Sequence, residues 1–460
     1  MTVTPHRQPL CHSCEAIFEL LDANRYHPLV SLTFPLPRVD PLVALQILSP
    51  ASQPYFYWEH GDQSFALLDV ALTQDVCGVN RFAQAQEFIQ QVSNHIHVIG
   101  AERSTKPRFF CRFPFFDAPT ATIPFATSQI CLPKWQISRY RGISSLVVNL
   151  QLDRSTDLLR LAAEINAMIT HLTHLAGRSL STSQNDVRLH SDQEAIDLLK
   201  IAISKSLAAI DRQELQKIVL AHSCLVTATQ NFSMPRCLDN LRHNHPDCYT
   251  FAINDGLGNC FLGASPERLV SVSDRQLVCD ALAGSAPRSQ LPAADRQLAQ
   301  QLLASPKEQH EHQLVRDFIV DSLQKLGLNP LWNKQPQLLA LTNIQHVWTP
   351  IQAALQAGRH PLAVVAALHP TPAVAGLPRN LACAKIQELE AVARSLYAAP
   401  IGWIDTAGNC ELVVGIRSAI VTGHQARLFA GAGIVAGSEI DREVAEIQLK
   451  FQSLYQALSG

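Results

Sequence analysis

Two pairs of glutamates have the clearest capacity for chemistry in this sequence. Glu308 and Glu311 form one pair, and Glu443 and Glu446 form the other, each spaced i, i+3 in a segment whose pattern predicts a helix. At that spacing, both members of a pair face the same side of a helix. Lys450 follows Glu446 by four residues and shares its face. Four carboxylates and a lysine on two helices suit a hard divalent cation beside an anionic ligand, which predicts Mg²⁺ chemistry on a carboxylate or phosphate substrate.

The start of the first glutamate helix allows a second interpretation of Glu308. Ser305 suits the N-cap, Pro306 suits the first helical position, and Glu308 falls at the third, which completes a capping box. Glu308 therefore serves either the helix start or the metal, and the sequence leaves both interpretations open. Glu311 has no comparable structural role in this pattern.

Composition excludes several classes of partner. The chain has 460 residues, 47% of them hydrophobic, which is enough to bury a large core. A net charge of −2 without a basic tract argues against nucleic acid or an anionic membrane as the main partner. No run of eighteen apolar residues predicts a membrane span, and the N-terminus lacks the order of charged and apolar residues of a secretory signal. We therefore expect a cytoplasmic protein.

The cysteines fit a reducing compartment. There are 12, scattered along the chain rather than grouped as in a disulfide framework. Cys11 and Cys14 form a CxxC, but no second CxxC follows to complete a zinc site. The favoured interpretation of this region is a segment of uncertain order rather than a metal site.

Periodicity predicts three parts. Residues 1–53, rich in Pro, His and Ser, are expected to be an N-terminal segment of uncertain order. Residues 54–190 are predicted to be a strand-rich, variable first half that ends in a polar loop, and 191–460 a core of alternating strands and helices. The helices are expected near 81–97, 154–176, 192–212, 295–326, 350–357, 378–395 and 439–458.

The stretch LFAGAGIVAG imitates a dinucleotide-binding turn, since it follows a predicted strand and precedes a helix. However, the short remainder after Gly437 leaves no place for the second strand and its acidic residue. A dinucleotide-binding oxidoreductase is therefore a weak alternative. The glycines instead suit close approach of backbone N–H groups to a carboxylate.

Seven strings, in order over about 215–455, carry a resemblance to a known family. They are QKIVLAHS, FLGASPERLV, ALAGSAPR, SPKEQHEHQLVRD, LHPTPAVAGLP, YAAPIGWIDTAGNCELVVGIRSA and LFAGAGIVAGSEIDREVAEIQLK. This half of the chain resembles the chorismate-utilising enzymes, which comprise isochorismate, salicylate, anthranilate and aminodeoxychorismate synthases. The resemblance implies one α+β domain with two packed antiparallel β-sheets and helices outside.

The resemblance also implies a set of site residues. The Mg²⁺ ligands correspond to Glu311 and Glu446, with Glu308 and Glu443 as their companions. The residues that match the family's substrate pocket are Arg417, Tyr397, Lys450 and Gly431 for the two carboxylates of chorismate, Gly284 and Ser285 along the ring, and the pocket histidine His346. An arginine fork and a bridging cation suit two carboxylates.

Lys217 and Glu267 match the general base and general acid of isochorismate synthases. The implied reaction is attack of a water, deprotonated by Lys217, on ring carbon 2, with protonation of the departing hydroxyl at carbon 4 by Glu267. A glutamate that donates a proton needs a raised pKa, which burial supplies. Taken alone, each of these residues is more often structural than catalytic.

Two positions separate the members of the family. Anthranilate synthases generally have glutamine where this chain has Lys217, and aminodeoxychorismate synthases have a nucleophilic lysine where it has Ala283. The segment from His369 to Gly376 resembles isochorismate rather than salicylate synthases, so salicylate synthase is the alternative. A non-catalytic chorismate-binding subunit is a third hypothesis, from a different class.

The resemblance extends to pathway and partners. The long N-terminal region favours a role in menaquinone or phylloquinone synthesis. No glutamine amidotransferase subunit is expected because the reaction needs no ammonia, and a monomer is expected because no obvious apolar interface helix is present.

Overall fold

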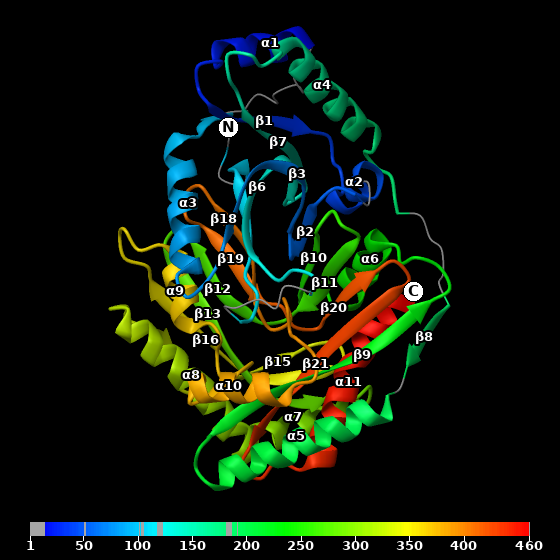
Figure 1. Cartoon of the computed structure of the whole chain (residues 1–460), viewed down its shortest axis with the longest axis vertical. Helices are drawn as coiled ribbons and strands as arrows, with labels where there is room; N and C mark the ends of the chain where they lie inside the picture. The colour runs from blue at the N-terminus through cyan, green and yellow to red at the C-terminus, as the bar shows by residue number, and fades with distance from the viewer. Residues whose placement is uncertain are drawn as a thin grey trace, which may run out of the picture.

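The computed structural model describes residues 14–49, 52–100, 102, 105–116, 123–180, 186–190 and 192–459, the side chain of Ser453 excepted. Within this part of the chain, 21 strands form one hydrogen-bonded network and 11 helices surround it (Figure 1). The predicted α+β class is confirmed. The two expected sheets are present as two arms of a single network.

The arms separate at β6 (Ser128–Tyr140). One edge of β6 pairs along its length with β3 (Gln63–Val76). The other edge pairs first with β5 (Arg108–Arg112) and then with β7 (Ile143–Gln151). A bulge in β3 between Val70 and Leu72 accompanies this change of partner. Long strands at one branch point thus give rise to both layers.

Each arm continues from the branch as a series of antiparallel strands. The first arm runs from β3 through β2 (Tyr55–His60), β10 (Tyr249–Asn254), β11 (Asn259–Ser265), β20 (Ser418–Thr422) and β21 (Gln425–Val435) to β9 (Lys217–Ala228), which also pairs with β8 (Val187–His190) and β17 (Gly376–Leu377). The second arm runs from β5 through β18 (Pro400–Asp405), β19 (Cys410–Val414), β12 (Arg268–Ser273) and β13 (Gln276–Pro287) to β16 (Ile344–Ala354), which also pairs with β14 (Leu331–Trp332) and β15 (Gln337–Ala340).

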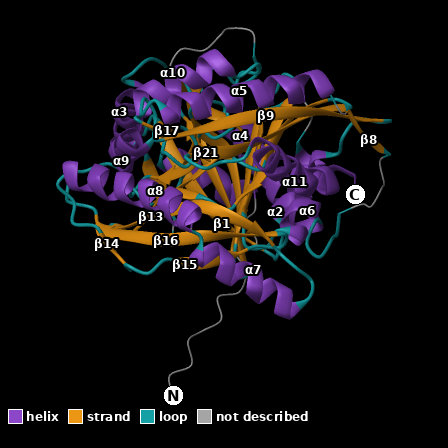
Figure 2. Cartoon of the chain, turned by 90° about the horizontal axis from the view of Figure 1, so that it is seen from below, coloured by secondary structure: helices purple, strands orange, loops and turns teal. Residues whose placement is uncertain are grey.

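The helices lie around the arms (Figures 1 and 2). Seen from below, α5 and α10 lie on one side of β9 and β21, whereas α8 and α7 lie near β13 and β16 (Figure 2). The helices are α1 (Cys14–Ala23), α2 (Pro41–Leu48), α3 (Arg81–His95), α4 (Leu158–His174), α5 (Gln193–Asp211), α6 (Met234–Asn244), α7 (Pro292–Ala304), α8 (Pro306–Lys325), α9 (Pro361–Leu368), α10 (Arg379–Leu389) and α11 (Ile440–Ser459).

Helix starts follow the capping signals in the sequence. Ser305 Oγ accepts a hydrogen bond from the N–H of Glu308 at the start of α8, with Pro306 at the first position. Asp192 and Asp157 cap α5 and α4 in the same way. Ser305 therefore caps α8, but the Ser305 N–H donates to the carbonyl of Leu302, so the Glu308 carboxylate does not complete the predicted capping box and instead lies 3.6 Å from Lys307 Nζ.

Three predicted helices are wrong in extent or type. The helix expected at 378–395 ends at Leu389 as α10. The segment 295–326 contains two helices, α7 and α8, because Ser305 ends one and caps the next. The segment 350–357 is not a helix, since residues 350–354 continue strand β16. Burial alternates there from Ile351 to Leu355, which is the two-residue period of a strand.

The first residues that the structure describes join the core. β1 (Leu29–Leu36) pairs with β7 and, in parallel, with β4 (His97–Ile99). α1 packs on α4, and Ile17 and Leu21 are buried between them and the sheet. Cys14 begins α1, whereas Cys11 lies outside the described residues. The boundaries near 53 and 190 stay predictions, and strand pairs such as β2–β10 and β5–β18 cross the second one.

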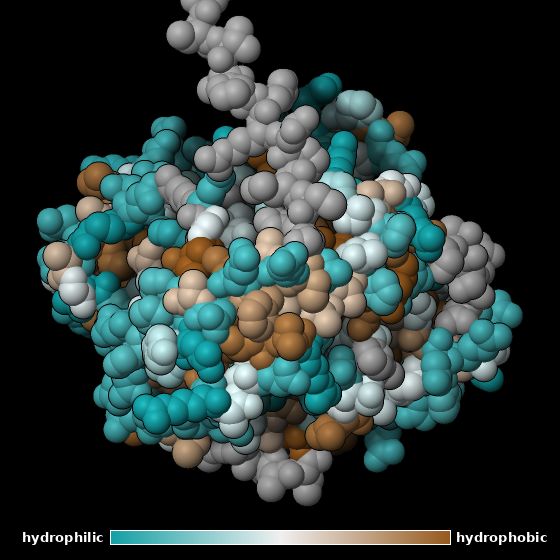
Figure 3. Space-filling view, turned by 90° about the horizontal axis from the view of Figure 1, so that it is seen from above, coloured by the Kyte–Doolittle hydropathy of each residue, from teal (hydrophilic) through white to brown (hydrophobic). Residues whose placement is uncertain are grey.

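Seen from the end where α1 and α4 lie, the surface is mainly hydrophilic, with hydrophobic side chains gathered near the middle of the face (Figure 3). In the described residues, no helix combines the length and apolar character that crossing a bilayer requires.

Gly376 illustrates how tightly the end of the first arm is packed. Its φ is +143°, and a Cβ there would lie 2.2 Å from the carbonyl oxygen of Lys217. We expect Gly376→Ala to lower the free energy of unfolding by about 2 kcal/mol or more, because it adds a backbone clash to a strained dihedral. The urea midpoint measures this effect.

Gly358→Ala is the matched control, because Gly358 also has a positive φ of +81° but nothing lies within 4 Å of its Cβ position. Equal losses in the two variants would show that only the dihedral, and not the contact with Lys217, constrains position 376.

Candidate active site

A cavity with about 900 Å³ of empty volume lies between the two arms. The first arm contributes Gly431 and Gly433 to its wall, and the second contributes Gly284, Ser285 and His346. Most of the predicted site residues line this cavity: Glu267, Gly284, Ser285, Glu311, His346, Tyr397, Arg417, Gly431, Glu443, Glu446 and Lys450. Lys217 and Glu308 lie directly behind the wall, in contact with Glu311 and Gly284 respectively.

Lys217 is the first residue of β9 and is fully buried. Its Nζ lies 2.8 Å from Glu311 Oε1, an ion pair whose angle is not that of a hydrogen bond, and no described residue accepts a hydrogen bond from it. A Cβ at Gly433, on the paired strand β21, would lie 2.4 Å from Glu311 Oε1 and 3.1 Å from Lys217 Cε. The glycine therefore makes the room in which this ion pair forms.

Glu267 stands between β11 and β12 and is 4% exposed. Its N–H donates to Ser265 Oγ at 3.2 Å, and its carbonyl accepts from Val414 N at 3.0 Å, so the backbone is fixed on both sides. Burial raises the pKa of its carboxyl to about 8, with Lys217 opposing the shift. Glu267 is therefore protonated at neutral pH.

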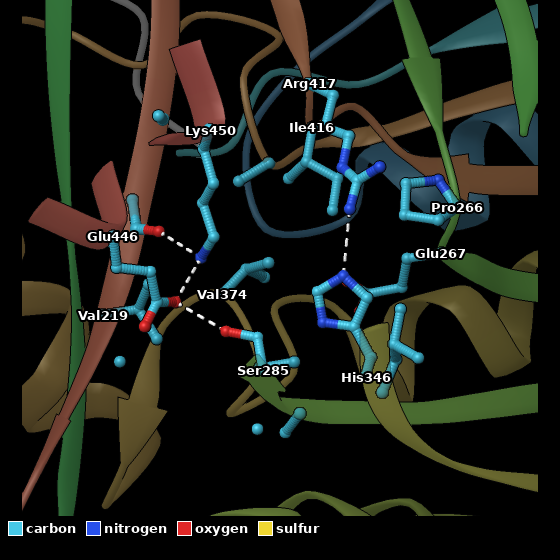
Figure 4. A pocket seen from close by; sticks show the side chains of 18 of the residues that line it. Val219, Pro266, Glu267, Ser285, His346, Val374, Ile416, Arg417, Glu446 and Lys450 are labelled. Atoms are coloured by element: carbon cyan, nitrogen blue, oxygen red, sulfur yellow. Dashed lines mark hydrogen bonds and ion pairs between the residues drawn. The ribbon is translucent and has the colours of Figure 1, made fainter. Parts of the chain in front are cut away.

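Arg417 and His346 form the opposite end of the cavity (Figure 4). Arg417 Nη2 lies 2.9 Å from His346 Nε2. Because arginine can only donate, Nε2 accepts and the proton of the imidazole is on Nδ1. Burial and the Arg417 charge hold the pKa of His346 well below its usual range, which keeps the ring neutral.

The remaining groups of Arg417 suit an anion. Its Nη1 is buried and has no hydrogen-bond partner among the described residues. Its backbone has a φ of +49°, which is uncommon for a residue with a side chain and characteristic of functional sites. The Arg417 guanidinium is thus held in place, and the N–H groups of its Nη1 can donate hydrogen bonds to an anion.

Lys450, Glu446 and Ser285 make a second polar group (Figure 4). Lys450 Nζ lies 2.7 Å from Glu446 Oε1 and donates to the carbonyl of Gly431 at 2.8 Å, while Ser285 Oγ donates to Glu446 Oε1 at 2.9 Å. Burial raises the pKa of Glu446, but Lys450 and Ser285 outweigh it, so the pKa lies below its usual value.

Tyr397 and Gly431 fit closely together. A Cβ at Gly431 would lie 2.9 Å from the Tyr397 hydroxyl, so a larger residue would displace that group. The Tyr397 ring stacks on Phe429 at 5.3 Å. Burial raises the pKa of the phenol, which therefore stays protonated and can donate a hydrogen bond.

The chain belongs to the chorismate-binding enzymes. The family described as "Chorismate binding enzyme" matches residues 15–459 of this chain, which is almost its whole length. The predicted family and the prediction that the chain is an enzyme are thereby confirmed.

Relatives of this chorismate-binding enzyme include isochorismate synthases. The salicylate biosynthesis isochorismate synthase of Pseudomonas aeruginosa is 31% identical over 439 residues, covering 94% of this chain and 90% of the relative. Isochorismate synthase MenF of Bacillus subtilis is 36% identical over 264 residues, 57% of this chain and 56% of its own. The structure of MenF, the menaquinone-specific isochorismate synthase from Escherichia coli, superposes with a TM-score of 0.77 at 27% identity, covering 96% of this chain and 99% of that one.

Each of the four glutamates of this chorismate-binding enzyme contacts a lysine, and Lys307 is shared by two of them, since its Nζ also lies 3.6 Å from Glu308. Glu311 is paired with Lys217, Glu446 with Lys450, and Glu443 with Lys307 Nζ at 2.8 Å. In this geometry, the described residues include no group of three or more His, Cys, Asp or Glu that could hold a metal ion.

The chemistry of these donors nevertheless fits Mg²⁺. Burial raises the pKa of Glu308, and the neighbouring carboxylates of Glu311 and Glu446 raise it further. Buried carboxylates that repel one another are stabilised by a cation, and all the donors are hard oxygens. The residues that would hold the ion are Glu308, Glu311, Glu443 and Glu446.

Two charged residues of the cavity wall were not predicted from the sequence, Lys307 and Arg394. Lys307 stands inside the predicted capping box, and its position next to Glu308 was a usable signal, since a lysine beside buried glutamates becomes a counterion. Arg394 follows Glu390 by four residues, but nothing in that spacing indicates that it lies in the cavity wall.

Glu267 should make stability depend on pH. In the unfolded chain its pKa is near the ordinary value of about 4.3, whereas in the folded chain it is about 8, so between these values the folded state binds the extra proton. Stability due to this group therefore falls as pH rises. Glutamine has no proton to lose. We therefore expect the free energy of unfolding of Glu267→Gln, taken relative to that of wild type, to rise by on the order of 3 kcal/mol between pH 5 and pH 8.

Urea titrations at pH 5, 6, 7 and 8 in the presence of a chelator measure this difference. Glu87→Gln is the control, because Glu87 is exposed on α3 and should track wild type at every pH. A difference between Glu267→Gln and wild type that stays constant across the range would refute the raised pKa.

Proposed function

We propose that this enzyme is an isochorismate synthase, which converts chorismate reversibly to isochorismate with Mg²⁺. The observation that carries the proposal is the combination of a fully buried lysine and a glutamate that is protonated at neutral pH beside one cavity rich in cationic donors. A base and an acid of this kind suit addition of water at one ring carbon and loss of hydroxide from another.

Lys217 is the proposed base. In its neutral form, Nζ takes a proton from a water molecule while the water oxygen bonds to ring carbon 2. The ring double bonds shift, and the bond between carbon 4 and its hydroxyl oxygen breaks. Since Nζ has no hydrogen-bond acceptor among the described residues, its lone pair is available to a water in the cavity once the proton has left.

Glu267 is the proposed acid. Its proton passes to the departing hydroxyl, so that a water molecule leaves and the atoms balance. In the reverse direction, Glu267 accepts the proton and Lys217 gives one up. A carboxyl group with a pKa of about 8 is suited to both directions near neutral pH.

The substrate carboxylates would be held at two places. Arg417 Nη1 offers free donors at one end of the cavity, whereas Tyr397 lies beside Gly431, whose carbonyl is bound by Lys450. At the other end, Lys450 and the glutamates form the proposed metal site. When bound, Mg²⁺ would neutralise a substrate carboxylate and the glutamates together.

The alternatives within the family have weaker support. Ala283 lines the cavity where an aminodeoxychorismate synthase has its nucleophile, so no amine is available for covalent attack there. Lys217 favours activation of water over use of ammonia, which supports the expectation that no amidotransferase subunit is needed. The proposed route for the product is quinone synthesis, by a monomeric enzyme in the cytoplasm.

Chromatography of chorismate incubated with the purified protein tests the activity. With Mg²⁺ we expect a new isomer that stops short of full conversion, because the reaction is reversible, and with excess chelator we expect none. Mg²⁺ should also raise the melting temperature of the protein without substrate, since a ligand bound only by the folded state stabilises it.

Other products would redirect the assignment. Salicylate together with pyruvate would make the protein a salicylate synthase, and unchanged chorismate with measurable binding would make it a non-catalytic chorismate-binding subunit.

Removal of the proposed base should abolish turnover. We expect Lys217→Ala to lower kcat by about 100- to 10,000-fold, the usual contribution of a general base. Lys334→Ala serves as control because Lys334 is exposed and far from the cavity wall. A Lys217→Ala enzyme with more than a tenth of wild-type kcat would exclude Lys217 as the base.

A further inference from the structure

The cavity wall contains a buried ion pair to which the proposed reaction assigns no role. Arg394 follows helix α10 and is 1% exposed. Glu390 Oε2 accepts from Arg394 Nε at 2.9 Å, and Glu390 Oε1 accepts from Arg394 Nη2 at 2.5 Å. The two parallel bonds fix the guanidinium in one orientation.

This pair binds the free edge of strand β9. Arg394 Nη2 donates to the carbonyl of Val219 at 2.7 Å, and Glu390 Oε1 accepts from the N–H of Ala221 at 2.7 Å. Strand β17 pairs with β9 only at Lys217 and Ile218. Beyond that point, the Val219 N–H donates to the carbonyl of Ala375 at 2.7 Å, and the Glu390–Arg394 pair satisfies the Val219 carbonyl and the Ala221 N–H, which a neighbouring strand would otherwise bind.

The same arginine reaches two other parts of the wall. Its Nη1 donates to the carbonyl of Val374 at 2.6 Å, and Val374 lines the cavity. Its guanidinium lies 4.3 Å from the Phe115 ring centroid and 5.9 Å from that of Tyr397. One side chain thus connects β9, the segment before β17 and the proposed substrate-binding tyrosine.

The position of Lys217 depends on this edge of β9. Lys217 and Val219 are two residues apart on one strand and therefore point to the same face, and Val219 lines the cavity on the side of Glu446 (Figure 4). Lys217 Nζ is ion-paired with Glu311 at 2.8 Å but has no hydrogen-bond acceptor among the described residues, so the backbone of β9 acts together with this ion pair to fix where the ammonium lies.

Direct binding of substrate by Arg394 is a poor alternative. Four of the five N–H donors of a guanidinium are used by Glu390, Val219 and Val374. Arg417, in contrast, has a buried Nη1 with no partner among the described residues.

We propose that Arg394, oriented by Glu390, is a positioning residue that holds β9 so that Lys217 faces the reacting water. This inference rests on the proposed function, in which Lys217 is the base. The Glu390–Arg394 pair then acts through the edge of β9 and does not contact the substrate.

Steady-state kinetics with chorismate and Mg²⁺ test this proposal in three variants. Arg394→Lys keeps the charge but cannot bridge Glu390, Val219 and Val374 together, and Glu390→Gln keeps the size but removes the charge. We expect both to lower kcat by about 100-fold, the effect of a small misplacement of a catalytic group, with KM changed less than threefold. Arg379→Lys is the matched control, since Arg379 also donates to a backbone carbonyl, that of Ala367, and lies over an aromatic ring, that of Phe318.

Chemical rescue separates positioning from loss of folding. Guanidinium ion added to Arg394→Ala should restore part of kcat, whereas the same concentration of sodium chloride should not. The circular dichroism spectrum and melting temperature of each variant show whether it is folded. If Arg394→Lys does not fold, the kcat of Glu390→Gln tests the proposal in its place.

Three results would overturn the proposal. Wild-type kcat in both Arg394→Lys and Glu390→Gln would remove the positioning role while leaving the proposed function intact. A raised KM with unchanged kcat would mean that Arg394 binds substrate. Wild-type enzyme that leaves chorismate unchanged would overturn the proposed function and this inference with it.

Discussion

Burial of charge between the two sheet arms is the constraint on which the rest of the structure depends. Three lysines, Lys217, Lys307 and Lys450, each contact a glutamate in or behind the cavity wall. A charge taken out of water is costly unless it is paired, so the carboxylates and ammonium groups must arrive together. The surrounding glycines on β21 and β13 make this possible, because side chains at Gly433 or Gly284 would collide with Glu311 or Glu308.

The same burial gives the site its chemistry. Glu267 retains its proton at neutral pH because water is excluded around it, and His346 remains neutral for the same reason. Arg417 and Glu446 nevertheless lie in the same cavity. The cavity therefore contains a protonated acid, a neutral imidazole and fixed charges, and the surrounding residues set the protonation state of each group. Reactions that move protons and hydroxyl groups around a ring need this combination.

Sequence was a good guide wherever the signal is local. The capping box predicted the start of α8, and the glutamate spacing predicted that each pair shares a helix face, both of which the structure confirms. The contact of Lys217 with Glu311 joins residues 94 positions apart, and only the resemblance to a family brought them together beforehand. The helix predicted over 350–357 is wrong because residues 350–354 pair with β13, and this tertiary pairing overrides the helix propensity of the alanines there. The place of Arg394 in the cavity wall was not predicted because its spacing to Glu390 indicates only a helical ion pair, and its other partners are backbone carbonyls, which leave no pattern in sequence.

The branching of the network at β6 has a mechanical consequence. Among the strand pairings of the described residues, both arms trace back to this strand, and Lys217 lies at the far end of one arm while Ser285 and His346 lie at the far end of the other. Because the two arms diverge from β6, a small rotation of one arm relative to the other at β6 would produce a larger displacement at the far strands β9 and β16. Since strand twist depends on side-chain packing, substitutions in β6 that touch no ligand would alter the gap between these far strands. Packing on β6 therefore bears on the distance between the two cavity walls, although β6 itself lies outside the cavity lining.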